Sequence, residues 1–334
     1  MSRPAKLDLA VARYLVSRKA RGIKRFPLVT MLEPLEACNL ACVGCGRVRE
    51  YRDVIDRRLS VEDCLAAVRV SDAPIVSISG GEPLLHREIG EIARAIEADR
   101  RFIYLCTNGL LLRESLDAFR PSARLAFVVH LDGTETIHDR VTERPGAHGE
   151  AIDAIRDAIG RGFRVCTNTT LFHGSDVDDL HRSFAELAEI GVEGLMVSPG
   201  YAYEDAPDQD LFLQRRESID VFRRVLDPAN GFPFYNNPLY LDFLRGESAY
   251  DCAAWTTPTF TVCGWRVPCY AIADRHTDDV AELFRDGLWN DYGPGHDRRC
   301  ASCMMHSSFE GASILHAMAH PWKLVRLAQG AWRR

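Results

Sequence analysis

Cysteines 38, 42 and 45 stand in the run Cys38-Asn-Leu-Ala-Cys42-Val-Gly-Cys45, directly after an apolar stretch typical of a buried β-strand. Three thiolates this close together can ligate three irons of a cubane cluster and leave the fourth iron open, whereas a purely structural cluster takes four cysteines. An open iron can bind an exogenous ligand. Zinc is the alternative, but it usually takes four protein ligands in short paired spacings, and no fourth Cys or His lies near in the sequence.

A second motif, Ser79-Gly80-Gly81-Glu82-Pro83, follows the next apolar run. Together, the C-x3-C-x2-C spacing and this GGEP motif resemble the radical S-adenosylmethionine (SAM) superfamily. The resemblance implies that the three cysteines hold a 4Fe–4S cluster that binds S-adenosyl-L-methionine and cleaves it reductively. We expect the two glycines to let the backbone approach the ligand closely, and Glu82 to accept a hydrogen bond from the SAM ammonium.

Composition favours a globular protein with metal sites. The chain has 334 residues, 46% hydrophobic and 26% charged, which suits one large domain with an appendage. Its eleven cysteines are clustered, and neither a signal peptide nor an apolar stretch long enough for a membrane span is found, so metal ligation is favoured over disulfides. We therefore expect a cytoplasmic protein.

Strand-like and helical segments alternate from residue 27 onward, which predicts an α/β fold with a parallel sheet and right-handed crossovers. We expect strands at 28–32, 75–79, 102–106, 125–131, 164–171 and 194–198, and helices at 60–70, 88–98, 150–159 and 176–190. Combined with the resemblance, this pattern predicts a partial (β/α)6 TIM-like radical SAM barrel over residues 27–228. Sites in such barrels gather at the C-terminal ends of the strands, where both motifs fall.

Polar residues end the later strands. The resemblance implies that His130, Asp132, Asn168 and Ser198 contact the ribose, carboxylate and adenine of SAM; alternatively, Asp132 belongs to a plain turn and Asn168 caps a strand end. Cys106 ends the third strand, so its thiol should face the barrel mouth. A thiol S–H is weaker than an alkyl C–H, so Cys106 can quench a carbon radical by giving up hydrogen. The alternative for Cys106 is a buried small hydrophobe.

Residues 229–334 lack the βα rhythm and carry the remaining cysteines, which predicts a smaller cysteine-rich domain. Cys252, Gly264 and Cys269 resemble the C-x(9–15)-G-x4-C opening of twitch or SPASM auxiliary-cluster domains. Cys300-Ala-Ser-Cys303 supplies two further thiols. Four thiolates would close a second 4Fe–4S cluster, and a structural zinc is the alternative because four cysteines also satisfy zinc. Cys263 would be left over.

Longer segments resemble the adenosylhopene transferase (adenosylhopane synthase) family. The segments are Ser77-Ile-Ser-Gly-Gly-Glu-Pro-Leu-Leu-His86, Tyr104-Leu-Cys-Thr-Asn108, Val129-His-Leu-Asp-Gly133, Tyr201-Ala-Tyr203-Glu204, Tyr240-Leu-Asp-Phe-Leu244 and Gly264-Trp265 with Pro268-Cys269-Tyr270. The resemblance implies addition of the 5′-deoxyadenosyl radical to the terminal alkene of a hopene (diploptene), with Cys106 reducing the resulting radical, in hopanoid biosynthesis. The alternatives are a paralogue that adenosylates another alkene and a peptide-modifying radical SAM enzyme.

Two departures from the expected patterns stand out. Gly44 occupies a position that is commonly aromatic in the superfamily, and the last cysteine of the family's C-terminal motif is absent after Cys303. We expect the first change to alter adenine stacking without altering cluster ligation. The resemblance also implies a low-potential electron donor such as flavodoxin or ferredoxin.

Both ends of the chain are basic. Residues 1–26 hold eight Lys or Arg and one acid, and residues 321–334 hold four and none, although the whole chain carries −6. This pattern indicates an anionic surface, and no nucleic acid, as partner. We expect an amphipathic helix to dock on the inner membrane face and collect a hydrophobic isoprenoid substrate, unless its apolar face covers the barrel base. The apolar face comprises Leu7, Val11, Tyr14 and Leu15, flanked by Arg3, Lys6, Arg13, Arg18 and Lys19.

Overall fold

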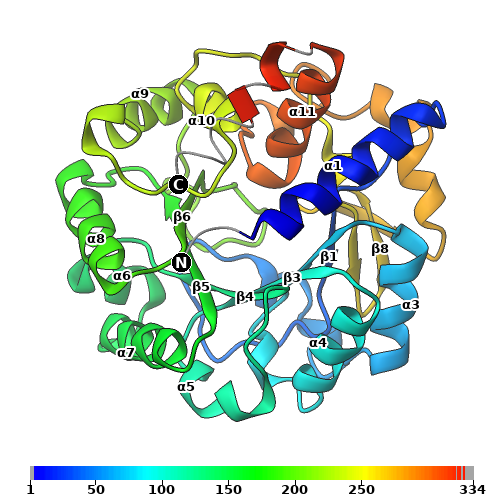
Figure 1. Cartoon of the computed structure of the whole chain (residues 1–334). Helices are drawn as coiled ribbons and strands as arrows, with labels where there is room; N and C mark the ends of the chain where they lie inside the picture. Colours follow the sequence, from blue (N-terminus) through cyan, green and yellow to red (C-terminus); the bar gives the residue numbers. More distant parts are fainter. Residues whose placement is uncertain (1–3, 321, 325, 328–334) are drawn as a thin grey trace.

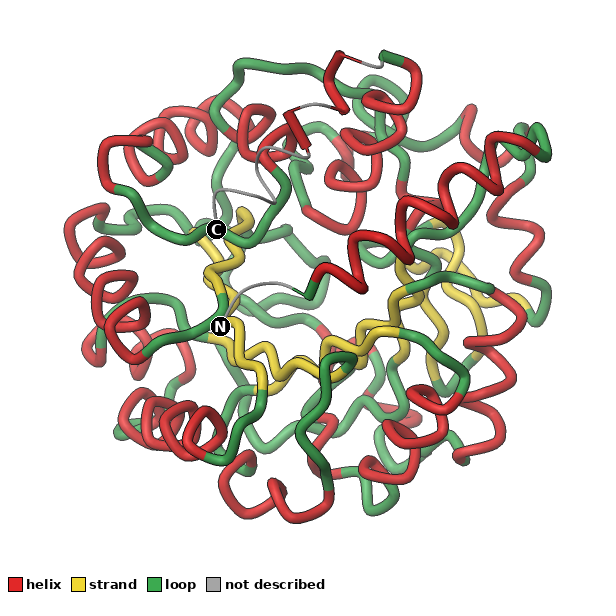
Figure 2. Tube along the Cα trace, in the orientation of Figure 1, coloured by secondary structure: helices red, strands yellow, loops and turns green. Residues whose placement is uncertain are grey.

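In the part of the chain that the structure describes, nine strands form one continuous sheet in the order β6-β5-β4-β3-β2-β1-β7-β8-β9. The sheet curves through the centre of the molecule (Figure 2). The computed structural model describes residues 4–320, 322–324 and 326–327. The strands are β1 (Val29–Leu32), β2 (Ile75–Ile78), β3 (Phe102–Thr107), β4 (Leu125–His130), β5 (Arg164–Leu171), β6 (Gly194–Pro199), β7 (Thr259–Thr261), β8 (Gly264–Pro268) and β9 (Ala273–Thr277).

Helices connect the strands and lie around the outside of the curved sheet (Figure 1). They are α1 (Ala5–Ala20), α2 (Arg47–Glu50), α3 (Val61–Ser71), α4 (Ile89–Ala98), α5 (Leu112–Ser115), α6 (Glu135–Thr142), α7 (Ala147–Gly160), α8 (Val177–Ile190), α9 (Arg215–Val225), α10 (Pro238–Leu244) and α11 (His306–Ala319). Short 3-10 turns join them, among them η2 (Pro83–Leu85), η5 (Ala254–Thr256) and η8 (Arg298–Cys300).

Strands β1 to β6 pair in parallel in chain order, which confirms the predicted partial (β/α)6 barrel. Each of the six strands lies within one residue of its predicted ends. The predicted start of α3 is also confirmed, because Ser60 and Asp63 form a capping box that satisfies the first amides of the helix. Helix α7 begins earlier than expected, at Ala147, after Gly146 takes a positive φ of 83°.

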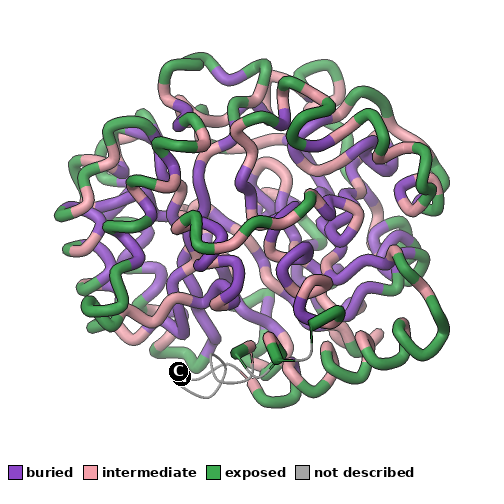
Figure 3. The backbone as a smooth tube through the Cα atoms, turned by 90° about the horizontal axis from the view of Figure 1, so that it is seen from above, coloured by how far each residue is buried: buried purple, intermediate pink, exposed green. Residues whose placement is uncertain are grey.

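The two faces of the barrel sheet differ in burial. Alternate residues such as Ile78, Leu105 and Phe127 are fully buried in the apolar core. Figure 3 shows that buried residues concentrate in the interior and exposed ones at the periphery. The opposite face lines the barrel interior and carries half-buried, mostly polar side chains. These are Ser77, Tyr104, Cys106, His130, Asn168 and Met196. The period-2 pattern therefore places a polar lumen inside an apolar shell.

The sheet continues into the C-terminal region. Strand β7 pairs in parallel with β1, with Met31 opposite Thr259, and β8 and β9 extend the sheet in antiparallel. The sequence predicted no strands here, because each is only three to five residues long and lacks the βα alternation. The predicted domain boundary at residue 229 stays a prediction, although strands from both sides of it belong to the same sheet.

Helix α1 confirms the predicted N-terminal helix, yet it turns the expected lipid-facing side toward the protein. Leu7 is fully buried and Val11, Tyr14 and Leu15 are half-buried. The Tyr14 hydroxyl donates to the Pro27 carbonyl at 2.7 Å, and the helix crosses one end of the barrel (Figure 1). The prediction that these four residues form a membrane-binding face is therefore wrong, because they pack against the protein. The predicted Arg3 and the basic residues 333–334 lie outside the described residues.

Candidate active site

The glycines of the GGEP motif fix the cysteine loop by direct backbone contact. A Cβ on Gly80, whose φ is 109°, would lie 2.2 Å from the Leu35 carbonyl oxygen, and one on Gly81 would lie 2.1 Å from that of Ala37. The amide of Gly81 donates to Leu35 at 3.2 Å and that of Glu82 to Ala37 at 2.8 Å. The close approach is therefore to the segment leading into Cys38, and glycine contact with SAM stays a prediction.

Glu82 joins this motif to the end of β3. Its carboxylate is fully buried and accepts from the amide of Leu84 at 3.0 Å, the hydroxyl of Thr107 at 2.9 Å and the amide of Asn108 at 2.8 Å. Burial raises the pKa of Glu82 even though these donors oppose the shift. Pro83 is buried at the start of η2. The expected contacts of Glu82 and Pro83 with SAM stay predictions.

Asn108 is a site residue that the sequence pointed to only as part of a motif. Its side-chain amide donates to Asn39 Oδ1 at 2.7 Å and lies 3.9 Å from the Cys38 sulfur. The chain can turn back at this point because Gly109 takes a φ of 86°. The sequence pattern that points to Asn108 is a polar residue followed by glycine, Asn108-Gly109, just after a predicted strand.

The three cysteines of the loop are half-buried and interact electrostatically with one another. The Leu40 amide donates to Cys38 Sγ at 3.4 Å. Burial raises the pKa of Cys38 to about 11 and that of Cys42 to about 12, so metal binding has to release these protons. Three sulfur donors on one loop fit the implied 4Fe–4S cluster. Within the described part of the chain, no three His, Cys, Asp or Glu side chains form a site for a single metal ion.

The structure brings His130, Asp132 and Asn168 together where the C-terminal end of β4 lies beside the middle of β5. His130 Nε2 and Asp132 Oδ2 are 2.8 Å apart, and Asn168 Nδ2 lies 3.5 Å from His130 Nδ1. Burial opposes charging of the ring, but Asp132 outweighs it and raises the pKa of His130. Ser198 is buried near the end of β6, opposite Thr170. Their contacts with SAM stay predictions.

Cys106 lies on the lumen face of β3, as the sequence predicted. Its sulfur is 3.5 Å from the Ser77 hydroxyl, and it packs beside Tyr104, Met196 and Tyr235. Burial raises the pKa of Cys106 to about 11, so at neutral pH the thiol keeps its hydrogen. The structure therefore places an S–H group inside the barrel.

A buried polar network starts from the tyrosines that share a cluster with Cys106, and no sequence pattern pointed to it. The hydroxyls of Tyr104 and Tyr235 are 2.8 Å apart, and Tyr235 donates to Glu193 at 2.9 Å. Arg164 binds both oxygens of Glu193 at 2.7 Å. These residues come from β3, the start of β5 and two loops, so only the folded barrel brings them together.

The four C-terminal cysteines also converge. Burial raises the pKa of the Cys303 thiol, and the thiols of Cys252, Cys269 and Cys300 raise it further. Each of the four sulfurs also accepts a backbone amide hydrogen bond. Amide hydrogen bonds to sulfur are among the features that tune iron–sulfur clusters. The set fits a second cluster, whereas Cys263 lies apart, near Arg57 and Glu36.

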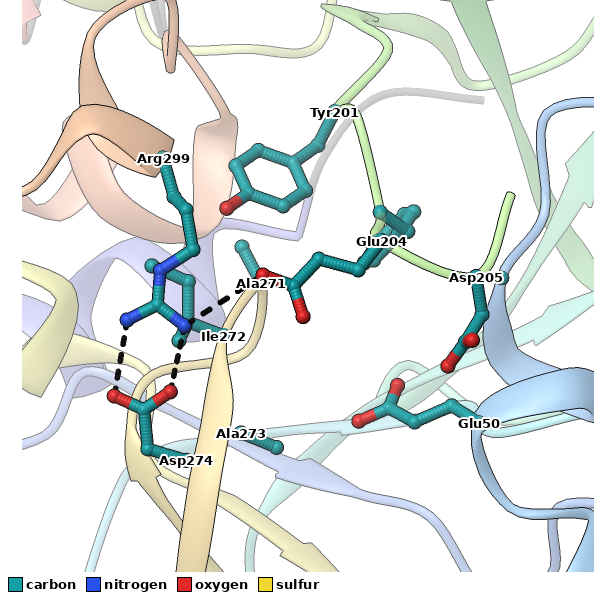
Figure 4. A pocket seen from close by; sticks show the side chains of 11 residues that line it. Glu50, Tyr201, Glu204, Asp205, Ala271, Ile272, Ala273, Asp274 and Arg299 are labelled. Atoms are coloured by element: carbon teal, nitrogen blue, oxygen red, sulfur yellow. Dashed lines mark hydrogen bonds and ion pairs between the residues drawn. The ribbon is translucent and has the colours of Figure 1, made fainter. Parts of the chain in front are cut away.

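A cavity of about 180 Å³ is lined by residues that neighbour both groups of cysteines in the sequence, namely Gly46, Ala271 and Arg299. Figure 4 shows the side chains around it. Gly46 and Glu50 line it from the side of the cysteine loop, and Tyr201 and Tyr203 line it from the segment after β6. Arg299 borders it beside Cys300 and binds Asp274 through two hydrogen bonds of 2.6 and 3.0 Å. The junction between the two groups is therefore polar.

Two family models match the chain. Residues 32–187 match the radical SAM superfamily, and residues 195–327 match a domain described as being of unknown function, DUF3463. The first match contains the three-cysteine loop and GGEP, and the second contains the four C-terminal cysteines. The first match ends within the last turn of α8, and the second begins at the start of β6.

Curated relatives and solved structures also resemble this chain. A GTP 3′,8-cyclase of Pelotomaculum thermopropionicum is 29% identical and covers 75% of this chain and 83% of its own length. GTP 3′,8-cyclase 1 of Mycobacterium tuberculosis is 29% identical over 45% of each chain, so this chain spans about half the length of the first relatives it matches. The solved structure of SuiB from Streptococcus suis bound to S-adenosylmethionine has a similar fold, with a TM-score of 0.68 and 17% sequence identity. The superposition covers 92% of this chain and 78% of SuiB.

Replacing Cys38, Cys42 and Cys45 together by Ala should abolish reductive SAM cleavage after anaerobic reconstitution, because the loop would lose its iron ligands. Iron should fall by about four per chain. Iron analysis and 5′-deoxyadenosine release measure both effects. Cys263→Ala, which lies outside both groups, is the control and should retain wild-type values. SAM cleavage by the triple variant would show that the assignment is wrong.

Removing Cys300 and Cys303 should release a second metal centre and leave the first intact. Wild-type protein is expected to hold about eight irons if both sites are cubanes, and the double Ala variant about four. Elemental analysis for iron and zinc measures this. Four irons with one zinc in the wild type would support the structural zinc instead, and four irons without zinc would contradict a second site.

Proposed function

We propose that this chain, whose residues 32–187 belong to the radical SAM superfamily, is an enzyme that adds a 5′-deoxyadenosyl group to an alkene. The proposed substrate is a hydrophobic isoprenoid, the hopene diploptene, and the product is adenosylhopane. The observation that carries the proposal is the Cys106 thiol inside the barrel, because addition to an alkene leaves a carbon radical that has to be reduced. The motif segments quoted from the sequence support the choice of alkene.

In this proposal, separate groups of residues bind the cluster, position its ligands and bind the cofactor. Cys38, Cys42 and Cys45 would hold the 4Fe–4S cluster, and the cluster with SAM supplies the 5′-deoxyadenosyl radical when bound. Asn108 positions Cys38 through Asn39. The lumen face around His130 and Asn168 provides hydrogen-bonding groups for a polar cofactor at the strand ends.

Cys106 completes the reaction in this proposal. Its S–H bond breaks as hydrogen passes to the tertiary carbon radical, which becomes a C–H bond, and the sulfur is left as a thiyl radical. One electron from a low-potential donor, such as flavodoxin or ferredoxin, and one proton restore the thiol. The raised pKa of Cys106 keeps that hydrogen on sulfur between turnovers.

A second candidate comes from the named relatives. The Pelotomaculum relative covers most of both chains and is a GTP 3′,8-cyclase, so a purine nucleotide is the alternative substrate. The fold shared with SuiB includes a C-terminal extension, which keeps the peptide-modifying hypothesis open. Mass analysis of products from SAM with diploptene, GTP or a peptide distinguishes the three, because adenosyl appears in the product only in the first case.

Cys106→Ser should still couple adenosyl to diploptene but lose the saturated product, because a hydroxyl O–H is too strong to reduce a tertiary radical. We expect the rate of adenosylhopane formation to fall roughly tenfold or more, which corresponds to at least about 1.4 kcal/mol in the activation free energy. Mass spectrometry of the lipid extract measures it. Cys64→Ala, at a buried thiol in α3, is the control. An unchanged rate would rule out Cys106 as the hydrogen donor.

Membrane docking is retained in this proposal on a different face of α1. Leu9 and Val16 are 51% and 68% exposed, and Lys6 and Arg13 alternate with them along the same stripe at spacings of three and four residues. Trp322 and Leu324, also exposed, follow α11, whose Met318 carbonyl accepts from Lys19. Among the described helices, none combines the length and hydropathy that crossing a bilayer requires.

Lys6→Gln with Arg13→Gln should weaken binding to anionic liposomes roughly thirtyfold, because each basic residue near such a surface contributes about 1 kcal/mol. Flotation of full-length protein with anionic and neutral vesicles measures the effect. Arg113→Gln with Arg156→Gln, on α5 and α7, makes the same charge change elsewhere. Equal binding by all three proteins would contradict docking through α1.

A further inference from the structure

Three tyrosines from two of the quoted motifs meet between the two groups of cysteines. Tyr201 lies two residues after the end of β6 and is 8% exposed. It packs in a small buried cluster with Cys300 and Met305, and Cys269 and Cys303 pack against that cluster. Burial raises the pKa of Tyr201, and the three neighbouring thiols raise it further. Tyr201 therefore stands against the C-terminal cysteine group.

Tyr203 reaches from Tyr201 to the cysteine loop. The two rings meet edge to face with centroids 5.1 Å apart. On its other side, the Cβ of Tyr203 packs so tightly against Gly46 that a Cβ on that glycine would lie 2.7 Å away. Gly46 follows Cys45 directly, and Cys45 and Tyr203 interact electrostatically. Tyr203 therefore contacts the loop one residue from a cluster ligand.

Tyr270 and Arg47 hold Tyr203 in this place. The hydroxyls of Tyr203 and Tyr270 are hydrogen-bonded, and the Arg47 guanidinium lies 4.6 Å from the centre of the Tyr270 ring. Arg47 is itself buried and paired with the buried Glu33. The path from one cysteine group to the other therefore runs along Tyr201 and Tyr203, beside the cavity that these side chains line. The two rings are in contact with each other, Tyr203 contacts the cysteine loop, and Tyr201 contacts the C-terminal cysteines.

We infer that Tyr201 and Tyr203 form an electron-tunnelling bridge between the C-terminal cysteine site and the three-cysteine site. This inference rests on the proposed presence of an iron–sulfur cluster at each site. One electron from a low-potential one-electron donor enters at the C-terminal site and crosses to the three-cysteine site, so the first site is oxidised by one electron and the second is reduced by one. No proton or bond is exchanged.

The tyrosines conduct without changing their own redox state. The potentials of iron–sulfur clusters lie far below the potential needed to oxidise tyrosine, so a hole on Tyr201 or Tyr203 is not accessible. The coupling then depends on unbroken packing and on the aromatic rings, and hardly on the hydroxyls. This distinguishes the bridge from a tyrosyl radical relay, in which the hydroxyl is essential.

Rapid-freeze-quench electron paramagnetic resonance (EPR) of the reconstituted full chain with SAM, without any alkene, tests the bridge. Titanium(III) citrate or reduced flavodoxin supplies the electron, and the Cys38, Cys42 and Cys45 triple Ala variant identifies the signal of the C-terminal site. Tyr201→Leu and Tyr203→Leu should reduce the C-terminal site at the wild-type rate and the three-cysteine site several-fold more slowly. Tyr203→Phe should behave like the wild type, as should Tyr14→Leu, whose ring lies on α1.

Equilibrium redox titrations complete the test. In the two Leu variants, iron content and both midpoint potentials should match the wild type while the transfer rate falls. Wild-type rates in both Leu variants would overturn the bridge, and so would zinc at the C-terminal site. Changed potentials or iron content would show that the tyrosines only position the loop. Because no alkene is present, these outcomes are independent of whether the chain adenosylates a hopene.

Discussion

The backbone of Gly80 and Gly81 pressing against that of Leu35 and Ala37 is the contact on which the site depends. Both glycines lie where a Cβ would overlap a carbonyl oxygen, so no other residue fits without moving the loop. Two amide hydrogen bonds then extend the parallel pairing of β1 and β2 beyond the strands. The cysteine loop is thereby held in place by main-chain atoms before any metal binds.

Buried charge secures the other side of the loop. Glu33 and Arg47 form a fully buried ion pair, and Arg47 also approaches Glu50, which in turn binds Arg266 of β8 at 3.0 Å. Breaking a buried pair of this kind typically costs about 3–5 kcal/mol, because one charge is left without a partner. Both Glu36 oxygens lack partners among the described residues, and burial raises the pKa of Glu36 well above its usual range. These ion pairs therefore connect the segment after the cysteine loop both to the barrel, through Glu33, and to the C-terminal strands, through Arg266.

Local patterns predicted the barrel well and its long-range contacts poorly. The apolar runs predicted the six strands, and the position of Cys106 at the end of one of them predicted that its thiol faces the barrel interior. By contrast, the Tyr104–Tyr235–Glu193–Arg164 network and the tyrosines at the junction join residues far apart in sequence, which no periodicity encodes. The face of α1 was misjudged for a related reason: Leu7 suits a bilayer and a protein core equally, and only the fold decides between them.

Strand β7 beside β1 has a consequence for how the chain is made. The cysteine loop follows β1, but the second neighbour of β1 is not synthesised until Thr259–Thr261. Until then, β1 presents unpaired amides and carbonyls along an open edge, the kind of surface that recruits other strands. Domains emerging from a ribosome generally fold N-terminal part first, so this nascent chain carries an incomplete sheet for more than half of its translation. The C-terminal region therefore covers the open edge of the strand that leads into the first three cysteines.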